Sequence, residues 1–297
     1  MQLMHQWSTV TYRTSGPRNM EVFRDYAVDK ALQYTYLMDG LLAFTSLHCA
    51  SRASEASDSH EHVAAALHYQ NQSIAEFNEK QSLVRISKES LDPVCLMTVL
   101  HAVTALVASL TPATPGEQLE PISGILMRVR KYALCLNDMI DEHHVWATSG
   151  ELKRILEGPT VLRIEEGGSF TAEKVRALTD AILANMNLDD TATPFFRSTL
   201  EKLEKAYADN NGRSVISWLI MVEPVFFQKA DMGEAAALVI LACWGTITCV
   251  LEDMWWSKYA GRRIVEELFS QLSGCDSRWN EILQWCCEQV EIHSRVQ

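Results

Sequence analysis

The feature that most constrains the fold is a long uncharged segment near the C-terminus. Seventeen consecutive residues, from Ala235 to Leu251, carry no charged side chain. A helix that is apolar on nearly every face has to be buried on nearly every face. The stretch from Gly233 to Trp256 therefore predicts the central helix of an all-α core.

The same segment also has the composition of a membrane-spanning helix. At about 1.5 Å per residue it would be roughly 25 Å long, which is short of the roughly 30 Å hydrocarbon layer. Its neighbours Glu234, Glu252 and Asp253 are acidic, and no Lys or Arg lies directly beside the run. We therefore expect a buried core helix and no membrane span.

Apolar residues recur at helical spacing along the rest of the chain, and no alternating run is long enough to predict a strand. A second strongly apolar helix is expected over 31–53, where Leu37, Leu41 and Phe44 share one stripe. No linker rich in Pro, Gly or Ser divides the 297 residues. The sequence predicts a single large all-α domain, with about ten or more helices around a very apolar C-terminal central helix. The other helices are expected near 1–13, 61–84, 92–110, 119–140, 149–158, 171–186, 193–209, 215–221, 258–272 and 276–291.

Charge and cysteine content exclude two classes of protein. The chain has 26 basic and 38 acidic residues, a formal net charge of −12, and no basic stripe. Because nucleic-acid affinity comes mainly from Lys and Arg on phosphates, we expect no direct binding to nucleic acid. The eight cysteines form no C-x-x-C pair, and the N-terminus lacks a signal sequence. Reduced thiols in a nuclear and cytoplasmic protein are the resulting expectation.

Motifs for catalysis or metal binding are weak. Asp-rich helix ends raise the alternative of an all-α isoprenoid enzyme, but Asp189-Asp190 is followed by no further acid at the required spacing. His60-Glu61-His62 does not reproduce the H-E-x-x-H spacing of a zinc site. The chain also lacks a G-x-S-x-G elbow and a glycine-rich phosphate loop. We expect a protein that is not an enzyme and has no metal site and no cofactor.

Several aromatic residues lie around Gly245, namely Trp244, Trp255, Trp256 and Tyr259. One interpretation is the wall of an apolar ligand pocket, in which the glycine leaves room and Thr246 or Thr248 binds a hydroxyl group. The other is helix packing, in which the glycine allows a neighbouring helix to approach closely. The residue pattern alone favours packing.

Four segments, in order, carry a resemblance to a known family. They are YLMDGLLAFTSLHCA (36–50), AALHYQNQSIAEF (65–77), DPVCLMTVLHAVTAL (92–106) and AALVILACWGTITCVLEDMWWSKYAGRRIVEEL (236–268). Together they resemble the fungal-specific transcription factor domain of binuclear zinc-cluster regulators, and most closely the sterol uptake control type. The resemblance implies that 1–297 is an all-helical, homodimeric regulatory domain that binds a sterol or another lipid in an apolar pocket. The predicted ligand-binding residues are Leu41, Phe44, Leu241, Trp244, Gly245, Thr248 and Trp255.

One departure from the family pattern affects the expected function. The chain has no six-cysteine zinc motif, so the DNA-binding head is expected to be absent from it. Sensing of an apolar small molecule remains open, and so does a helical scaffold that serves only for dimerisation or protein interaction. Gly245→Asp would distinguish these hypotheses, because it should alter the ligand response of a sensor and destabilise a packed core.

Overall fold

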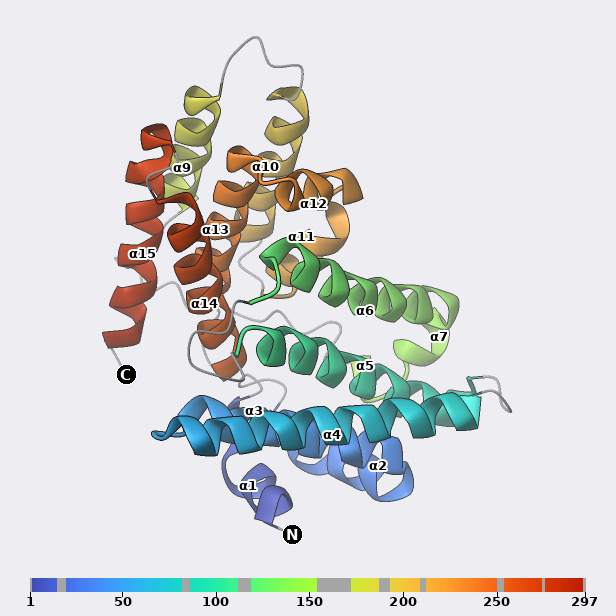
Figure 1. Ribbon diagram of the computed structural model, residues 1–297. Coiled ribbons are helices and arrows are strands. Elements are labelled where there is room, and N and C mark those ends of the chain that lie inside the picture. The colour runs from blue at the N-terminus through green and yellow to red at the C-terminus, as the bar shows by residue number, and fades with distance from the viewer. Residues whose placement is uncertain are drawn as a thin grey trace. The chain divides into compact units, whose positions relative to one another are not determined.

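The computed structural model describes residues 2–14, 20–81, 86–111, 119–153, 172–186, 193–208, 212–249, 254–273 and 276–295. Within these ranges every regular element is a helix, which confirms the predicted all-α fold (Figure 1). Chain contacts define two compact units. Unit 1 comprises Met1–Glu120, Arg128–Gly158 and Asp253–Trp256, and unit 2 comprises Pro121–Met127, Pro159–Glu252 and Ser257–Gln297. Each unit therefore combines segments that are distant in sequence.

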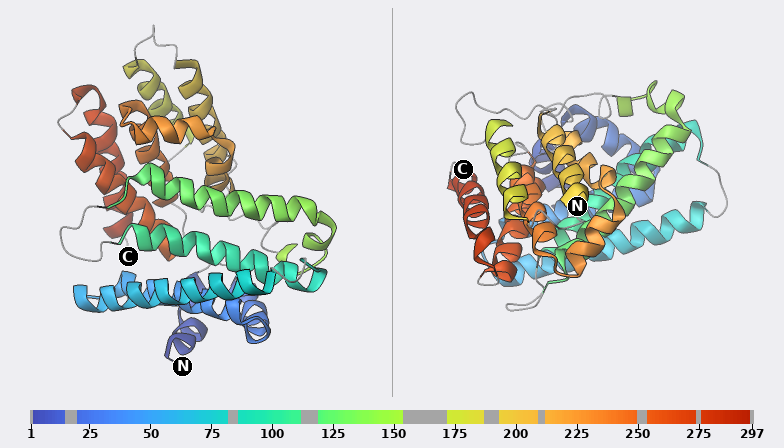
Figure 2. Two further views of the ribbon diagram at one scale, coloured as in Figure 1. Left: turned by 45° about the vertical axis from the view of Figure 1, so that its right-hand side comes forward. Right: turned by 90° about the horizontal axis from the view of Figure 1, so that it is seen from above.

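Unit 1 is built on a long hairpin of helices α3 and α4, and α5 packs against both of them (Figures 1 and 2). The apolar side chains of α3 and α5 form most of its core. Its elements are α1 (Gln2–Thr9), η1 (Thr11–Thr14), η2 (Val22–Tyr26), α2 (Ala27–Gln33), α3 (Thr35–Arg52), α4 (Ala56–Gln81), α5 (Lys88–Ser109) and α7 (His144–Ala147), with most of α6 (Ile122–Glu142).

Unit 2 contains the uncharged segment as helix α13, in which all residues from Ala236 to Cys249 are buried. Helix α13 packs against α10, α11, α12 and α15. A helix that is buried around its whole circumference needs neighbouring helices on several sides. The elements of this unit are α9 (Ala172–Asn185), α10 (Thr193–Ala208), α11 (Gly212–Met221), α12 (Pro224–Asp231), α13 (Ala235–Cys249), most of α14 (Trp255–Leu272), η3 (Ser277–Trp279) and α15 (Asn280–Arg295).

The predicted helix from Gly233 to Trp256 is shorter in the structure. Gly233 has a left-handed backbone, with φ of 78°, and lies in the turn before α13. The helix ends at Cys249, and Trp255 and Trp256 begin the next helix, α14. The run is buried from Ala236 to Cys249, but an uncharged composition does not specify where a helix begins and ends.

The start of α5 also differs from the prediction. Asp92-Pro93 was expected to open this helix, yet α5 begins at Lys88, where the Ser87 and Ser90 side chains form a capping box. Pro93 lies inside the helix and has no N–H to donate to the Glu89 carbonyl oxygen, four residues back. The Tyr34 hydroxyl donates to that oxygen instead, at 3.4 Å. A side chain from another helix thus partly replaces the missing backbone bond.

One described helix is long and apolar enough to cross a membrane, and it is α5. In the structure 83% of its apolar window is buried inside the protein, as in the core helix of a globular domain. Helices α12 and α13 would pass the same test together, but they meet at an angle of 111°. The described cysteines are free thiols, and those of Cys243 and Cys286 lie 3.9 Å apart between α13 and α15.

Candidate functional site

Gly245 lies where α13 and α14 cross within unit 2. A methyl group built on Gly245 would lie 2.9 Å from the Ile264 Cγ2 atom. One built on Gly261, the facing glycine of α14, would lie 2.5 Å from the Gly245 carbonyl oxygen and 2.7 Å from the Cys249 backbone nitrogen. The two backbones are therefore nearly in contact. The space beside Gly245 is occupied by α14, as the packing interpretation of this glycine requires.

The other predicted residues of α13 are engaged in the core of unit 2. Leu241, Trp244 and Thr248 are completely buried. The Trp244 indole N–H donates to the Val215 carbonyl oxygen at 3.0 Å, and its ring stacks on Trp218 with centroids 6.1 Å apart. The Thr248 hydroxyl donates to the Trp244 carbonyl oxygen at 2.8 Å. The polar atoms expected to orient a ligand thus already have protein partners.

The remaining predicted residues, Leu41, Phe44 and Trp255, belong to unit 1. Leu41 and Phe44 are buried on α3, and the ring of Trp255 meets Phe44 edge to face at 5.5 Å. The Trp255 ring also stacks on His48, with centroids 5.0 Å apart. The structure therefore brings Phe44 and Trp255 together in unit 1. The other four predicted residues, Leu241, Trp244, Gly245 and Thr248, lie on α13 in unit 2.

Buried polar atoms without a hydrogen-bond partner in the described part of the chain include His101 Nε2, Thr104 Oγ1 and Trp255 Nε1. Burial lowers the pKa of His101 to about 4, so its imidazole is neutral at physiological pH. An unpartnered buried polar group costs free energy, which marks these positions as places that would accept a water molecule or a ligand atom.

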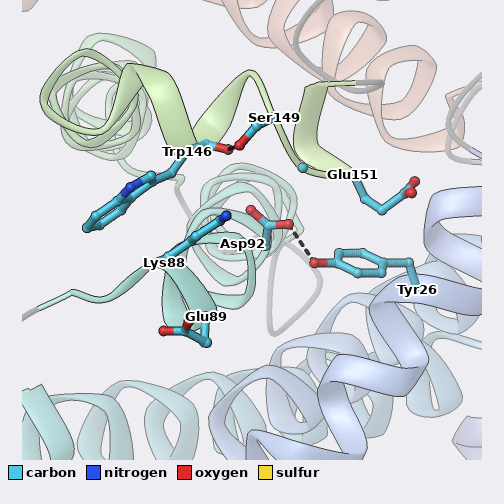
Figure 3. A pocket seen from close by; sticks show the side chains of 8 residues that line it. Tyr26, Lys88, Glu89, Asp92, Trp146, Ser149 and Glu151 are labelled. Carbon is cyan, nitrogen blue, oxygen red and sulfur yellow. Dashed lines mark hydrogen bonds between the residues drawn. The ribbon is translucent and has the colours of Figure 1, made fainter.

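A hollow of about 450 Å³ lies on unit 1, and none of the predicted ligand-binding residues lines it. It is formed where η2, the start of α5 and the turn after α7 meet (Figure 3). Its lining combines two aromatic rings with both signs of charge. The lining residues are Tyr26, Lys88, Glu89, Asp92, Trp146, Ser149, Gly150 and Glu151.

Asp92 supplies the buried carboxylate of this hollow. Only 7% of the residue is exposed, and the carboxylate accepts a hydrogen bond from the Tyr26 hydroxyl at 2.5 Å and another from the Leu152 backbone. Burial raises the pKa of Asp92, while both hydrogen bonds favour its ionised form. Burial and the Asp92 hydrogen bond also raise the pKa of Tyr26.

Lys88 and Trp146 form the opposite side of the hollow. Figure 3 shows the Lys88 ammonium group extending toward Asp92, with the indole of Trp146 beside it. His143 stacks on the Trp146 ring at a centroid distance of 4.8 Å, and the Ser149 hydroxyl donates to the Trp146 carbonyl oxygen at 3.1 Å. The Glu89 carboxylate is bound at the N-terminus of α5, where hydrogen bonds from its own backbone and Ser87 lower its pKa. This arrangement is suited to binding a charged molecule.

Within the described ranges, no three His, Cys, Asp or Glu side chains come together as metal ligands. Asp189-Asp190, which prompted the isoprenoid alternative, lies outside those ranges.

Sequence reasoning did not find the hollow, because its residues come from three segments without a shared motif. The Asp92-Pro93 pair looks like the start of the helix expected over 92–110, because proline is common in the first turn of a helix. The available signal is Ser87, whose side chain can cap a helix that begins at Lys88, and which leaves Asp92 as an acid inside an apolar helix.

Comparison with known proteins gives a distant relative. The chain is 22% identical over 305 aligned residues to a Zn(2)-C6 fungal-type transcription factor of Gibberella zeae. The alignment covers 96% of this chain and 60% of the relative, so the chain spans about 60% of the length of that protein. No family model and no solved structure matches the chain. The similarity relates this all-α chain to the Zn(2)-C6 fungal-type transcription factors.

Proposed function

We propose that this chain is the helical regulatory region of a fungal transcription factor. The observation that carries the proposal is the similarity to a Zn(2)-C6 fungal-type factor along 96% of the chain. The described chain is all-α, and its 297 residues contain no six-cysteine motif. Both features agree with a region that regulates transcription and does not itself bind DNA. Its place of action would be the nucleus, as for any transcription factor.

The chemistry of the chain favours regulation through protein or small-molecule contacts. A net charge of −12 opposes association with the phosphate backbone. The packed glycine crossing and the hydrogen-bonded Trp244 give the core of unit 2 the character of a scaffold. We therefore favour a helical dimerisation or interaction scaffold for unit 2.

A reporter assay tests the regulatory role. The chain would be fused to an unrelated DNA-binding domain and expressed in a fungal host that carries the matching promoter. The expected result is a change in reporter output relative to the DNA-binding domain alone, and loss of that change in Gly261→Ala, which disrupts the crossing with α13. Equal output from the fusion, the variant and the bare domain, at equal protein levels, would contradict the proposal.

A lipid-responsive role, of the sterol-binding type, is the second candidate function. One observation favours it: the Trp255 indole N–H is buried beside Phe44 and His48 without an acceptor. A sterol hydroxyl group would supply that acceptor within an aromatic environment. Burial of the apolar rings of the sterol, at about 25 cal/mol per Å² of apolar surface, would provide most of the affinity.

Native mass spectrometry followed by organic extraction tests this second role. A lipid present in near-stoichiometric amount, and lost in Trp255→Phe while the fold is retained, would support it. Protein that carries no lipid and does not change after incubation with ergosterol would leave the scaffold as the better description.

A further inference from the structure

The hollow beside α5 has the dimensions of a small-molecule site. Its volume of about 450 Å³ falls within the range of roughly 300 to 1,000 Å³ that ligand pockets occupy. All of its described lining residues belong to unit 1. Two of them, Tyr26 and Trp146, present aromatic rings (Figure 3).

Two opposite charges with unused binding capacity face this space. Lys88 forms no ion pair with any residue that the structure describes, although Asp92 lies one helical turn further along α5. The Asp92 carboxylate accepts two hydrogen bonds, and a carboxylate has about four acceptor positions. The hollow can therefore satisfy one anionic and one cationic group at the same time.

Most of the other charged groups around the hollow are already engaged. Glu89 is held by hydrogen bonds at the start of α5, and Lys30 lies over the Tyr26 ring at 5.5 Å. Glu151 has its own interactions and acts on Asp92 as a like charge, so it strengthens the attraction of this wall for a cation. The Trp146 indole, covered by His143 on one face, provides a flat apolar surface beside Lys88.

We propose that this hollow binds a zwitterionic ligand of the size of an α-amino acid. The ligand carboxylate pairs with the Lys88 ammonium group, the ligand ammonium group donates to the Asp92 carboxylate, and an apolar side chain lies along Trp146. Such a ligand matches both charges at once, whereas a simple anion or a simple cation leaves one of them without a partner. The site is independent of the regulatory role proposed above.

Isothermal titration calorimetry of the purified chain tests the proposal with three probes that share a phenyl ring. L-Phenylalanine carries both charges, 3-phenylpropanoate lacks the ammonium group, and 2-phenylethylamine lacks the carboxylate. Because a hydrogen bond to a charged group contributes about 1.5 to 3 kcal/mol, each singly charged probe should bind roughly tenfold more weakly or worse than phenylalanine.

Substitutions assign the two charges to residues. Lys88→Met should remove the preference for phenylalanine over 2-phenylethylamine, and Asp92→Asn should remove the preference over 3-phenylpropanoate. Lys131→Met, which removes an exposed lysine on α6, is the matched control and should bind phenylalanine like the parent protein. Lys88 is exposed, so its variant reports on binding even if Asp92→Asn unfolds. No heat of binding from phenylalanine at millimolar concentration, or equal affinity in Lys88→Met, would overturn the proposal.

Discussion

At the scale of single residues, the crossing of α13 and α14 depends on two glycines. A methyl group on Gly261 would meet backbone atoms at 2.5 and 2.7 Å, and backbone cannot move aside as a side chain can. We predict that Gly261→Ala destabilises the protein by about 3 kcal/mol, through overpacking that exceeds the gain in helix propensity. Gly245→Ala should cost less, because its closest neighbour is the Ile264 side chain. Urea unfolding followed by circular dichroism measures both.

Gly40 on α3 is the matched control for this pair. A methyl group there would meet Leu100 Cδ1 at 3.5 Å, which is an ordinary van der Waals contact. Gly40→Ala should therefore stabilise the protein by about 0.5 to 1 kcal/mol, because alanine favours a helix over glycine. Equal stability of Gly261→Ala and Gly40→Ala would show that the two backbones do not approach as closely as described.

A second prediction at this scale concerns pH. Burial lowers the pKa of His101 to about 4, below its ordinary value of 6.5. Between these values the unfolded chain binds a proton that the folded chain does not, so stability falls as the pH decreases from 6.5 to 4. We predict that His101→Phe reduces this loss by an amount on the order of 3 kcal/mol at pH 4. Thermal unfolding at pH 7 and at pH 4 measures the difference.

The control for this measurement is His5→Phe, the same substitution on the exposed face of α1. His48 is also buried, and its pKa is also lowered to about 4, so some acid sensitivity should persist in His101→Phe. Identical loss of stability on acidification in His101→Phe and the parent protein would exclude His101 as a cause of acid sensitivity.

At the scale of elements, α1 is attached to unit 1 mainly through one side chain. Trp7 is the buried residue of this helix; its ring meets Phe23 and Phe44 edge to face, and its indole N–H donates to the Phe23 carbonyl oxygen at 3.2 Å. We predict that Trp7→Ala costs about 3 to 5 kcal/mol, as for other large aromatic side chains in cores. It should also expose α1 to limited proteolysis.

The half-buried Leu3 of α1 serves as the control, because Leu3→Ala leaves the Trp7 contacts in place. It should give a smaller loss of stability and no early cleavage near the N-terminus. If both variants are cleaved at the same rate, Trp7 is not the residue that holds α1.

At the scale of the whole molecule, charge determines what the chain can bind by itself. With 26 basic and 38 acidic residues it should be repelled by nucleic acid. We predict no binding of the isolated chain to duplex DNA in fluorescence anisotropy at about 0.15 M salt. Binding that weakens steeply as salt increases would reveal a local basic surface and would contradict this expectation.

The sequence by itself determined the fold class and the position of most helices. Helical spacing of apolar residues is a local property, and the uncharged run from Ala235 to Leu251 required a helix buried on all sides, as α13 is. The distant similarity to a fungal transcription factor agrees with the family resemblance seen in the sequence, although the sterol-sensing type remains a proposal.

Tertiary structure decided the sites, because contacts between distant segments are not encoded in periodicity. It assigned Gly245 to a crossing with Gly261, gave Trp244 a backbone partner, and placed Trp255 on a different helix beside Phe44. It also placed the Tyr26 hydroxyl within hydrogen-bond distance of Asp92, 66 residues away in the sequence. This pair forms one wall of a hollow that no sequence motif predicts. A local pattern shows which residues are buried, whereas packing chooses the neighbours of each one.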